Sequence, residues 1–319
     1  MDQANLFDRH KLRQKLRFWR ITTIVIGFLI VCAFYISQSD NLIPQDHIAR
    51  VEIYGVIQDS DELIARLEAI EKDETAKAMI LTISSSGGTT FGGERIYNAI
   101  KRVSAQKPVV ADIRTLAASA GYMIAVASDH IVAGKTSIIG SIGVIFQYPQ
   151  FSELMKKIGI SYEEIKSSPL KAEPSPFHPA SEEATEMINS MIVDSYDWFV
   201  DLVAENRDMS RAQTLVLADG SIYTGRQSLE NGLIDSLGGM KEIRAFLSSK
   251  DISAELQIID RDPPRAPAGN FFTGSLQGII QQLLGVDAQL TPKWFTDQKL
   301  FLDGLLSFWQ FGGSHQKQN

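Results

Sequence analysis

The sequence predicts an α/β protein, a mostly parallel sheet flanked by helices and preceded by one N-terminal transmembrane helix. Two observations predict this class. From residue 48 onward, short β-rich runs alternate with helix-like segments, an order that favours parallel strands joined by crossover helices. Before them, residues 21–39 carry no formal charge. The composition, 44% hydrophobic and 22% charged over 319 residues, is typical of a globular protein and excludes a disordered or collagen-like chain.

The first 39 residues divide into a basic tail and an apolar segment. Residues 1–20 carry a net charge of +4. A helix over residues 21–39 rises about 1.5 Å per residue and spans roughly 28 Å, close to the ~30 Å of bilayer hydrocarbon. Because basic flanks stay in the cytoplasm, we expect a cytoplasmic tail over 1–20 and a single-pass inner-membrane anchor over 21–39. The remainder would then lie on the periplasmic or extracytoplasmic side.

Three other interpretations of this segment are open. A cleavable signal peptide needs a small-x-small cleavage site, and no convincing one follows the apolar run. A lipoprotein built on Cys32 would need a small residue where Val31 stands. A buried core helix fits poorly with the charged flank. Cys32 is the only cysteine, which excludes an intramolecular disulfide and a cysteine-based zinc cluster.

The rest of the chain carries a net charge of −11, which argues against nucleic acid as a partner. We expect one domain over residues 45–260 and an extension of unknown role over 261–319, which starts with the linker RDPPRAPAG. Strands are expected at 47–57, 77–83, 108–113, 130–133, 142–146 and 255–259. Helices are expected at 60–71, 91–105, 181–209 and 241–249, with a short small-residue helix after 118.

Ser119 is the first candidate for chemistry. It lies in the small-residue run LAASAGY, between an expected strand and an expected helix. A hydroxyl nucleophile needs a tight strand-to-helix turn, small neighbours and a helix N-terminus whose amides face the reaction centre. The same local pattern is also that of a serine that caps a helix and packs against small residues.

Gly88 is the second candidate, at the end of Ser84-Ser85-Ser86-Gly87-Gly88 after an apolar strand. Ligands usually bind at the carboxyl ends of strands in an open α/β sheet. The Gly88 N–H and the amide after Ser119 would make a two-donor oxyanion hole, in which each donor is worth about 10²–10³ in turnover. A glycine pair alone is more often only a turn.

A nucleophilic serine needs a base, and no histidine arrives with a recognisable partner motif. The five histidines are His10, His47, His130, His178 and His315. A neutral lysine can replace histidine, because desolvation and hydroxyl contacts lower a lysine pKa by several units. The lysine candidates are Lys135, Lys166 and Lys171, although most lysines are solvated surface charges.

Four glycine- and serine-rich stretches are spread over about residues 48–250. They are Ser85-Ser86-Gly87-Gly88, Ala118-Ser119-Ala120-Gly121-Tyr122, Gly140-Ser141-Ile142-Gly143-Val144, and Ala218-Asp219-Gly220 leading through Tyr223-Thr224-Gly225-Arg226-Gln227 to Gly232-Leu233-Ile234-Asp235. In order and spacing, these stretches together resemble the signal peptide peptidase A family, membrane-anchored Ser–Lys peptidases with a Clp protease/crotonase-like fold.

The resemblance implies a role for each site residue. Ser119 would be the nucleophile, and Gly88 and Ala120 would supply the oxyanion amides. Lys171, the second lysine of Lys166-Ser167-Ser168-Pro169-Leu170-Lys171, would be the general base, and Ser141 would orient its amine. Ser-Ser-Pro-Leu between the two lysines departs from the family pattern, so whether Lys166 substitutes for Lys171 is open. The resemblance implies no metal or organic cofactor.

By the same resemblance, the chain would hydrolyse peptide bonds in remnant signal peptides through an acyl-enzyme. Family members with one such domain form ring-shaped homo-oligomers, in which adjacent protomers share a site. Two alternatives are an acyl-CoA enzyme of the crotonase type and a catalytically silent membrane scaffold that binds peptides or a partner protease. The natural substrates, the cleavage-site preference and the ring size are not given by the sequence.

Overall fold

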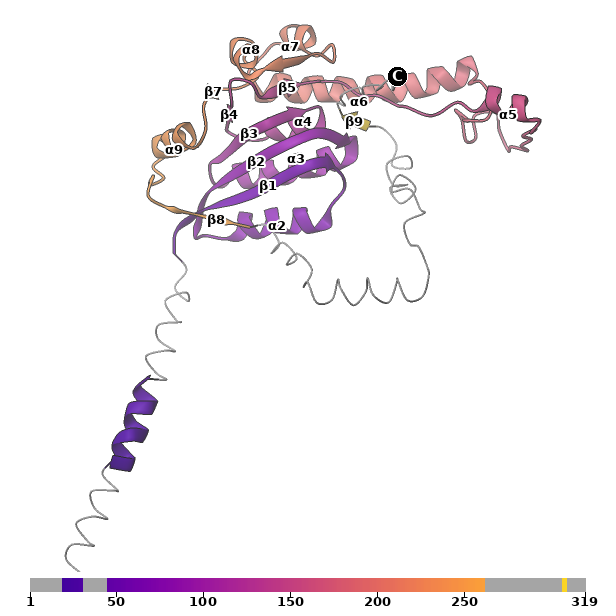
Figure 1. Cartoon of the computed structure of the whole chain (residues 1–319). Coiled ribbons are helices and arrows are strands. Elements are labelled where there is room, and N and C mark those ends of the chain that lie inside the picture. The colour runs from indigo at the N-terminus through magenta and orange to yellow at the C-terminus, as the bar shows by residue number, and fades with distance from the viewer. Residues whose placement is uncertain (1–18, 31–44, 262–305, 309–319) are drawn as a thin grey trace, which may run out of the picture. The chain divides into compact units, whose positions relative to one another are not determined.

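The computed structural model describes residues 19–30, 45–261 and 306–308 (Figure 1). The chain divides into two compact units, residues 1–46 and 47–319. In the first unit, residues 19–30 form a helix with exposed apolar side chains. No helix of the described ranges is both long enough and apolar enough to cross a bilayer. The rest of the predicted anchor, residues 31–39, and the tail up to residue 18 lie outside the described residues.

The described part of the second unit contains one nine-stranded sheet. The main strand order is β6-β5-β3-β2-β1-β8, while β4 pairs with β3 and β7, and β9 pairs with β2. All pairs are parallel except β5 with β6 and β2 with β9. The strands are β1 (His47–Ile57), β2 (Ala76–Thr89), β3 (Val109–Ala118), β4 (His130–Ala133), β5 (Ile138–Gly140), β6 (Ile222–Thr224), β7 (Ser236–Leu237), β8 (Gln257–Asp260) and β9 (Leu306–Phe308).

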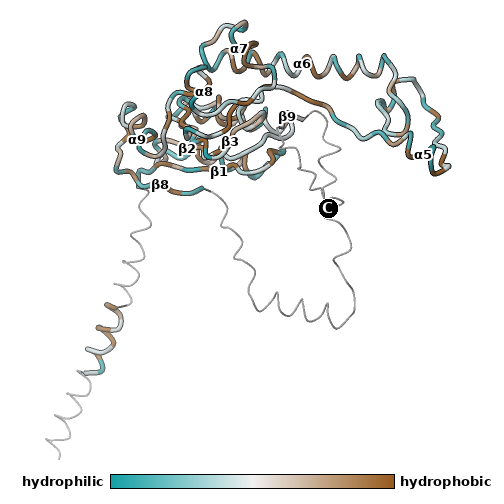
Figure 2. The backbone as a smooth tube through the Cα atoms, turned by 45° about the horizontal axis from the view of Figure 1, so that its top comes forward, coloured by the Kyte–Doolittle hydropathy of each residue, from teal (hydrophilic) through white to brown (hydrophobic). Residues whose placement is uncertain are grey.

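Helices cover both faces of the sheet. The helices are α2 (Asp61–Lys72), α3 (Thr90–Ser104), α4 (Ala120–Ala125), α5 (Ser152–Ile158), α6 (Glu182–Asn206), α7 (Arg211–Leu217), α8 (Gly225–Glu230) and α9 (Met240–Ser249). The main core joins one face to α2, α3, α4 and α6, and a smaller core joins the other face to α9. Figure 2 shows hydrophobic positions along the central strands, as expected for strands buried on both faces.

The sequence predicted this architecture well. The predicted strands over 47–57 and 130–133 are confirmed to the residue, and the α/β class with a mostly parallel sheet is confirmed. Helix starts follow capping rules: the Ser60 hydroxyl accepts from the N–H of Leu63, and the Ser181 hydroxyl accepts from that of Ala184.

One predicted strand, residues 142–146, is wrong. The strand of this region is β5, which ends at Gly140. Gly140 and Ser141 have φ angles of 108° and 51°, and two successive left-handed residues cannot continue a strand. In the apolar run after them, Ile142 and Val144 are buried by packing, whereas Ile145 is exposed and forms an isolated β-bridge that does not extend into a strand. β2 and β3 also run further than predicted, to Thr89 and Ala118.

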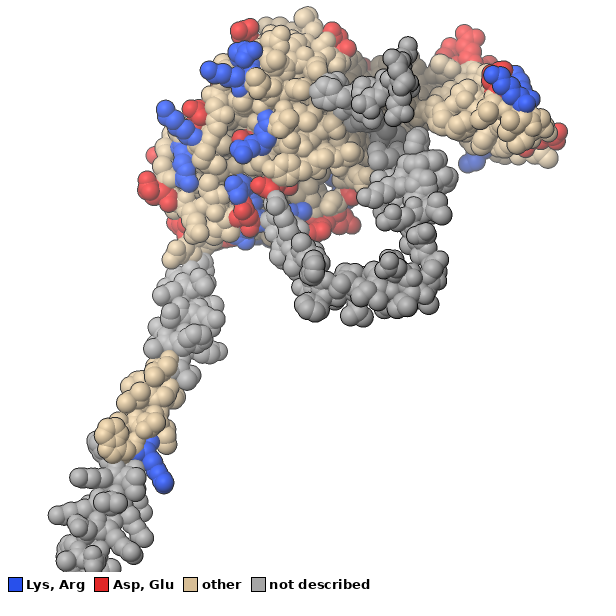
Figure 3. All heavy atoms as spheres, viewed as in Figure 1, with Lys and Arg blue, Asp and Glu red and all other residues tan. Residues whose placement is uncertain are grey.

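Residues 146–181, called the arm here, extend away from the sheet together with the first half of α6 (Figure 1). The buried apolar residues of α6 gather in its last turns, from Phe199 to Val203, and of its first turns only Ala184 is buried. Figure 3 shows the arm as a lobe beside the main body, with charged side chains at its surface. The arm also exposes large apolar side chains, including Leu154, Ile158, Ile160, Tyr162 and Ile165.

Candidate active site

Ser119 lies in a sharp turn between β3 and α4. Its φ and ψ are 56° and −120°, a backbone conformation that L-residues rarely adopt. The turn is fixed on both sides: the Ser119 N–H donates to the carbonyl of Gly140 at 2.8 Å, and its own carbonyl accepts from the N–H of Tyr122 at 2.9 Å. Only 1% of the residue is exposed. This strand-turn-helix geometry is the one that a nucleophile requires.

Ser141 lies beside Ser119 on the wall of one cavity. The cavity has a volume of about 380 Å³. The Ser141 N–H donates to the carbonyl of Ser221 at 2.7 Å, which fixes the turn after β5. The structure thus brings the predicted nucleophile and the predicted orienting serine together. The other lining residues are Ile142, Gly143, Val144, Ile145, Ile192, Val193, Tyr196, Ala218, Asp219 and Gly220.

Gly88 is required by close packing at the end of β2. A Cβ at this position would lie 1.8 Å from the carbonyl oxygen of Ile57, at the end of β1. The turn before it is fixed by Ser85, whose hydroxyl donates to the Gly55 carbonyl at 2.6 Å and accepts from the Gly87 N–H at 3.1 Å. The backbone of β2 therefore approaches β1 as closely as only glycine permits.

The start of α4, which holds the Ala120 amide, packs against the same end of β2. A Cβ on Gly121 would lie 2.8 Å from the Ser85 carbonyl oxygen. Ala120 itself is fully buried. The two predicted oxyanion donors therefore belong to backbone segments that meet at one edge of the sheet, beside Ser119.

Lys171 lies in the arm and is not among the residues that line the Ser119 cavity. Its side chain is exposed, and it has no hydrogen-bond or ion-pair partner among the described residues. Within one chain, the structure does not bring the predicted base to the predicted nucleophile. The third lysine candidate, Lys135, also lies away from that lining.

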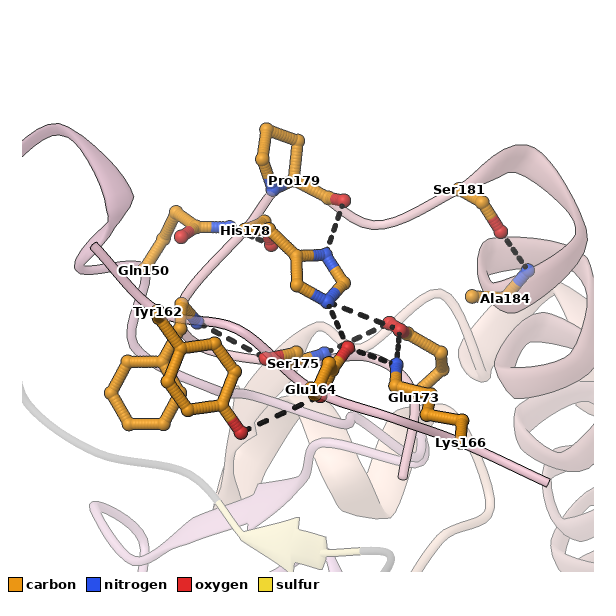
Figure 4. Close-up of polar contacts among 11 residues, drawn as sticks. Gln150, Tyr162, Glu164, Lys166, Glu173, Ser175, His178, Pro179, Ser181 and Ala184 are labelled. Carbon is orange, nitrogen blue, oxygen red and sulfur yellow. Dashed lines mark hydrogen bonds and ion pairs between the residues drawn. The ribbon is translucent and has the colours of Figure 1, made fainter. Parts of the chain in front are cut away.

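Lys166 belongs to a cluster of four charged side chains in the arm (Figure 4). Its ammonium contacts the carboxylates of Glu164 and Glu173. His178 Nε2 lies 2.9 Å from Glu164 Oε1 and 3.3 Å from Glu173 Oε1. Hydrogen bonds to the two carboxylates raise the pKa of Lys166, so this amine keeps its proton.

The cluster includes three residues with ligand atoms suited to a metal ion, namely Glu164, Glu173 and His178. The Lys166 ammonium already contacts both carboxylates, so it supplies the positive charge that a metal ion would bring. Sequence reasoning considered His178 and Lys166 separately and missed that two glutamates join them. A signal was available in the sequence, because five ionisable residues, the four of the cluster and Lys171, lie within the fifteen positions 164–178.

The described histidines, His47, His130 and His178, do not line the Ser119 cavity. His130 stacks on Phe246 with ring centroids 4.4 Å apart, and its Nε2 lies 3.0 Å from the Ser236 hydroxyl. Burial lowers the pKa of His130 and favours its neutral form. These contacts give His130 a structural role.

Tyr122 and Asp235 connect the motifs of the sequence to one another. The Tyr122 hydroxyl donates to the Leu233 carbonyl at 2.8 Å, and both residues are fully buried. Asp235 accepts from the Ile131 N–H at 2.7 Å and pairs with the guanidinium of Arg207 at 2.7 Å. These residues hold α4, β4 and α6 in place and do not touch the cavity.

Tyr196 and Asp219 line the cavity but were not assigned to the site from the sequence. The Tyr196 hydroxyl donates to the Ala218 carbonyl at 2.9 Å, which ties α6 to the cavity wall. Asp219 accepts from the Ser221 N–H at 2.9 Å, and hydrogen bonds from Ser221 lower its pKa. Asp219 stood in a quoted motif, but nothing in the local sequence marks Tyr196.

Comparisons with known proteins agree with this geometry. Residues 101–251 match peptidase family S49, and residues 47–139 match Clp protease. A Synechocystis sp. protein that carries a protease name is 35% identical over 249 residues, which are 76% of this chain and 84% of that protein. A Methanocaldococcus jannaschii protein, also named as a protease, is 37% identical over 205 residues, 64% of this chain and 63% of its own length. Protease 4 of Haemophilus influenzae is 34% identical over 205 residues, 61% of this chain and 33% of that protein.

The fold and these matches place the protein in the class of serine proteases with a Clp protease-like α/β fold. The chain belongs to peptidase family S49, the signal peptide peptidase A family. It spans less than two thirds of the length of the archaeal relative and a third of the Haemophilus protein.

Proposed function

We propose that this protein hydrolyses peptide bonds through a Ser119 acyl-enzyme, with Lys171 as the general base. The observation that carries the proposal is the strained turn at Ser119, which opens onto a cavity shared with Ser141. Neutral Lys171 would take the Ser119 proton as the hydroxyl attacks the scissile carbonyl. The Gly88 and Ala120 amides would hold the oxyanion, and the Lys171 ammonium would give its proton to the leaving amine as the C–N bond breaks. The lysine, neutral again, would then take a proton from the water that hydrolyses the acyl-enzyme and releases Ser119.

In this proposal, Lys171 reaches Ser119 of a neighbouring protomer in a ring-shaped homo-oligomer. Two features support it. The Lys171 ammonium is exposed and outside the Ser119 cavity of its own chain. The arm that contains it also exposes Leu154, Ile158 and Ile165, an apolar surface suited to packing against a second copy.

The substrate would bind as an added strand beside β2. The pairing of β9 with β2 supports this, because Ser307 lies opposite Gly88 in an antiparallel register. An extended peptide in that position has its carbonyls near the proposed oxyanion amides. Side chains such as Ile142 and Ile192 in the cavity wall favour small and aliphatic residues next to the scissile bond.

We further propose that residues 21–39 anchor the protein in the inner membrane and that remnant signal peptides are its substrates. The uncharged sequence of this segment and its basic flank support the anchor. The proposed topology places the domain from residue 45 on the extracytoplasmic side, beside membrane-embedded peptides. Enterococcus faecium has a relative, 34% identical over 227 residues, named as a signal peptide peptidase.

The test uses the full-length chain in detergent and a fluorogenic peptide derived from a signal sequence. Wild type is compared with Ser119→Ala and Lys171→Ala, and labelling by a fluorophosphonate reports on the serine directly. We expect both variants to lose hydrolysis by at least about 10³-fold without losing their fold, and only Ser119→Ala to lose the labelling site. Because a lysine must be neutral to accept a proton, wild-type activity should rise toward alkaline pH.

Mixing the two inactive variants tests the shared site. A mixed oligomer of Ser119→Ala and Lys171→Ala protomers should regain part of the activity, because some interfaces then combine an intact serine with an intact lysine. Undiminished cleavage by Ser119→Ala would exclude Ser119 as the nucleophile and, with it, the proposed mechanism. An assembled wild type that neither cleaves nor labels would favour the scaffold function.

A further inference from the structure

We infer that Lys166 is a positioning residue that holds Lys171 in place through ion pairs with Glu164 and Glu173. This inference rests on the proposed function, in which Lys171 is the base. Lys166 and Glu173 bracket Lys171 in the chain, and their ion pair closes the loop between them (Figure 4). Closing so short a loop restricts its backbone, and this restriction fixes the position of the Lys171 Cα from which the side chain extends.

The backbone inside this loop is tightly turned. The Lys171 N–H donates to the Ser168 carbonyl at 3.1 Å, and the Glu173 N–H donates to the Leu170 carbonyl at 3.3 Å. Ala172, directly after the proposed base, has a φ of 63°, a conformation that is unfavourable for alanine. Such a turn persists only where neighbouring contacts impose it, and the ion pair across the loop supplies that restraint.

The restraint is strong because the pair is largely removed from water. The side chain of Lys166 is 16% exposed and that of Glu173 is 5% exposed. Glu173 also accepts from the Ser175 N–H at 3.0 Å, which connects the ion pair to the segment of the arm that leads back to α6. Removing Lys166 would leave the two carboxylates with His178 as their one cation in the cluster, which costs more than the loss of an exposed surface pair.

His178 completes the charge balance of the cluster. Its Nδ1 lies 3.0 Å from the Pro179 carbonyl, and its Nε2 faces Glu164 and Glu173. Both ring nitrogens therefore face acceptors, which only the protonated imidazole satisfies. Two cations and two carboxylates then neutralise each other, and the Pro179 carbonyl and Glu164 raise the pKa of His178.

The arrangement separates the roles of the two lysines. The Lys166 ammonium is bound to two carboxylates and keeps its proton, so it is unsuited to proton abstraction. The Lys171 amine has no partner among the described residues and extends from the restrained loop into solvent. In the assembled enzyme, Lys166 would act on the reaction only through the position of Lys171.

The experiment compares kcat and KM of Lys166→Met and Lys166→Arg with wild type, using the full-length chain and the same fluorogenic peptide. Methionine keeps the volume without the charge, and arginine keeps the ion pairs. Lys156→Met is the matched control, because Lys156 pairs with Glu153 at 2.7 Å on the same arm but is 69% exposed. Hydrogen exchange of the amides in residues 166–173 gives a second readout that does not require catalysis.

We expect Lys166→Met to lower kcat at least tenfold with KM within about twofold, and to speed exchange in residues 166–173 by tenfold or more. Lys166→Arg should restore both to within about threefold of wild type, and Lys156→Met should match wild type. Exchange in β1 to β3 should stay unchanged in every variant, which excludes general unfolding. Glu173→Gln should resemble Lys166→Met, and the double variant should be no worse than either single one.

Two results would overturn the inference. A kcat of Lys166→Met equal to that of wild type would show that the cluster does not position the base. Equal inactivity of Lys166→Arg and Lys166→Met, with an active Lys171→Ala, would make Lys166 itself the base. Failure of the proposed function gives a different pattern, an active Ser119→Ala, and the exchange data would still report whether Lys166 holds the loop.

Discussion

The backbone N–H of Ser119 donates to the carbonyl of Gly140, the residue directly before Ser141, at 2.8 Å. The hydrogen bond joins the ends of the neighbouring strands β3 and β5, and each strand end is followed by a serine with positive φ. The relative position of the two hydroxyl-bearing residues is thus set by the sheet itself. A site built on strand ends is more rigid than one built on long loops.

Ser141→Ala should lower kcat by about tenfold or more while leaving the melting temperature within about 2 °C of wild type. The alanine keeps the backbone contact to Ser221 but removes the hydroxyl proposed to orient the incoming amine. Hydrolysis of the fluorogenic peptide and a thermal melt measure the two effects. An unchanged kcat would remove Ser141 from the proposed mechanism.

Gly88→Ala should destabilise the domain by about 3 kcal/mol or more, because the new Cβ would lie 1.8 Å from the Ile57 carbonyl oxygen. Denaturant unfolding measures the loss of free energy. Gly143→Ala is the matched control, since its Cβ would meet nothing closer than 3.9 Å. Equal unfolding free energies for the two variants would show that β1 and β2 can separate at this point without cost.

Tyr122→Phe should lower the free energy of unfolding by about 1–3 kcal/mol, because it leaves the buried Leu233 carbonyl without its 2.8 Å hydrogen bond. The ring still fills its site, so the change isolates the hydroxyl. Tyr148→Phe, an exposed tyrosine of the arm, should change the unfolding free energy by less than about 0.5 kcal/mol. A loss as small at Tyr122 as at Tyr148 would argue against a tight connection between α4 and the 232–235 motif.

The domain should lose stability in acid through Asp73. Burial favours the neutral form of Asp73, but hydrogen bonds from Thr75 and Arg261 outweigh it and hold the pKa at about 2, below the ordinary 3.8. A lowered pKa in the folded state stabilises the fold above pH 3.8, and this stabilisation is lost as the pH falls toward 2. The difference in unfolding free energy between wild type and Asp73→Asn should therefore stay constant above about pH 4 and shrink below it. A difference that stays constant down to pH 2 would contradict this account.

Most of the fold could be predicted because its signals are local. Apolar runs such as 77–83 mark buried strands, and serines such as Ser60 mark helix starts. The strand predicted over 142–146 failed because hydropathy does not report the left-handed turn at Gly140 and Ser141. The short elements β6 and β7 depend on pairing with distant strands, which no local window contains.

In the candidate site, too, some residues could be predicted from local sequence and others could not. Ser119 directly follows β3 and Gly88 lies near the end of β2, so their placement at the carboxyl ends of one sheet was predictable from the sequence. The place of Ser141 was not, because the strand was expected after it, over 142–146, whereas the observed strand β5 ends directly before it. Tyr196 comes from a long helix whose register against the sheet is set only by tertiary packing. The assignment of Lys171 as base, and that of Ser119 as nucleophile, stay predictions until the variants are measured.

The strained backbone at Ser119 has a consequence for how the sequence tolerates change. A glycine adopts a φ of 56° and a ψ of −120° more readily than serine does, so Ser119→Gly should relieve strain and make the domain more stable. At the position proposed for the nucleophile, selection for folding stability alone would therefore favour glycine over a residue with a side chain. A serine is kept at this position only by selection for something other than stability. In a lineage that has lost this selection, Ser119 should be replaced early by drift while the surrounding fold persists.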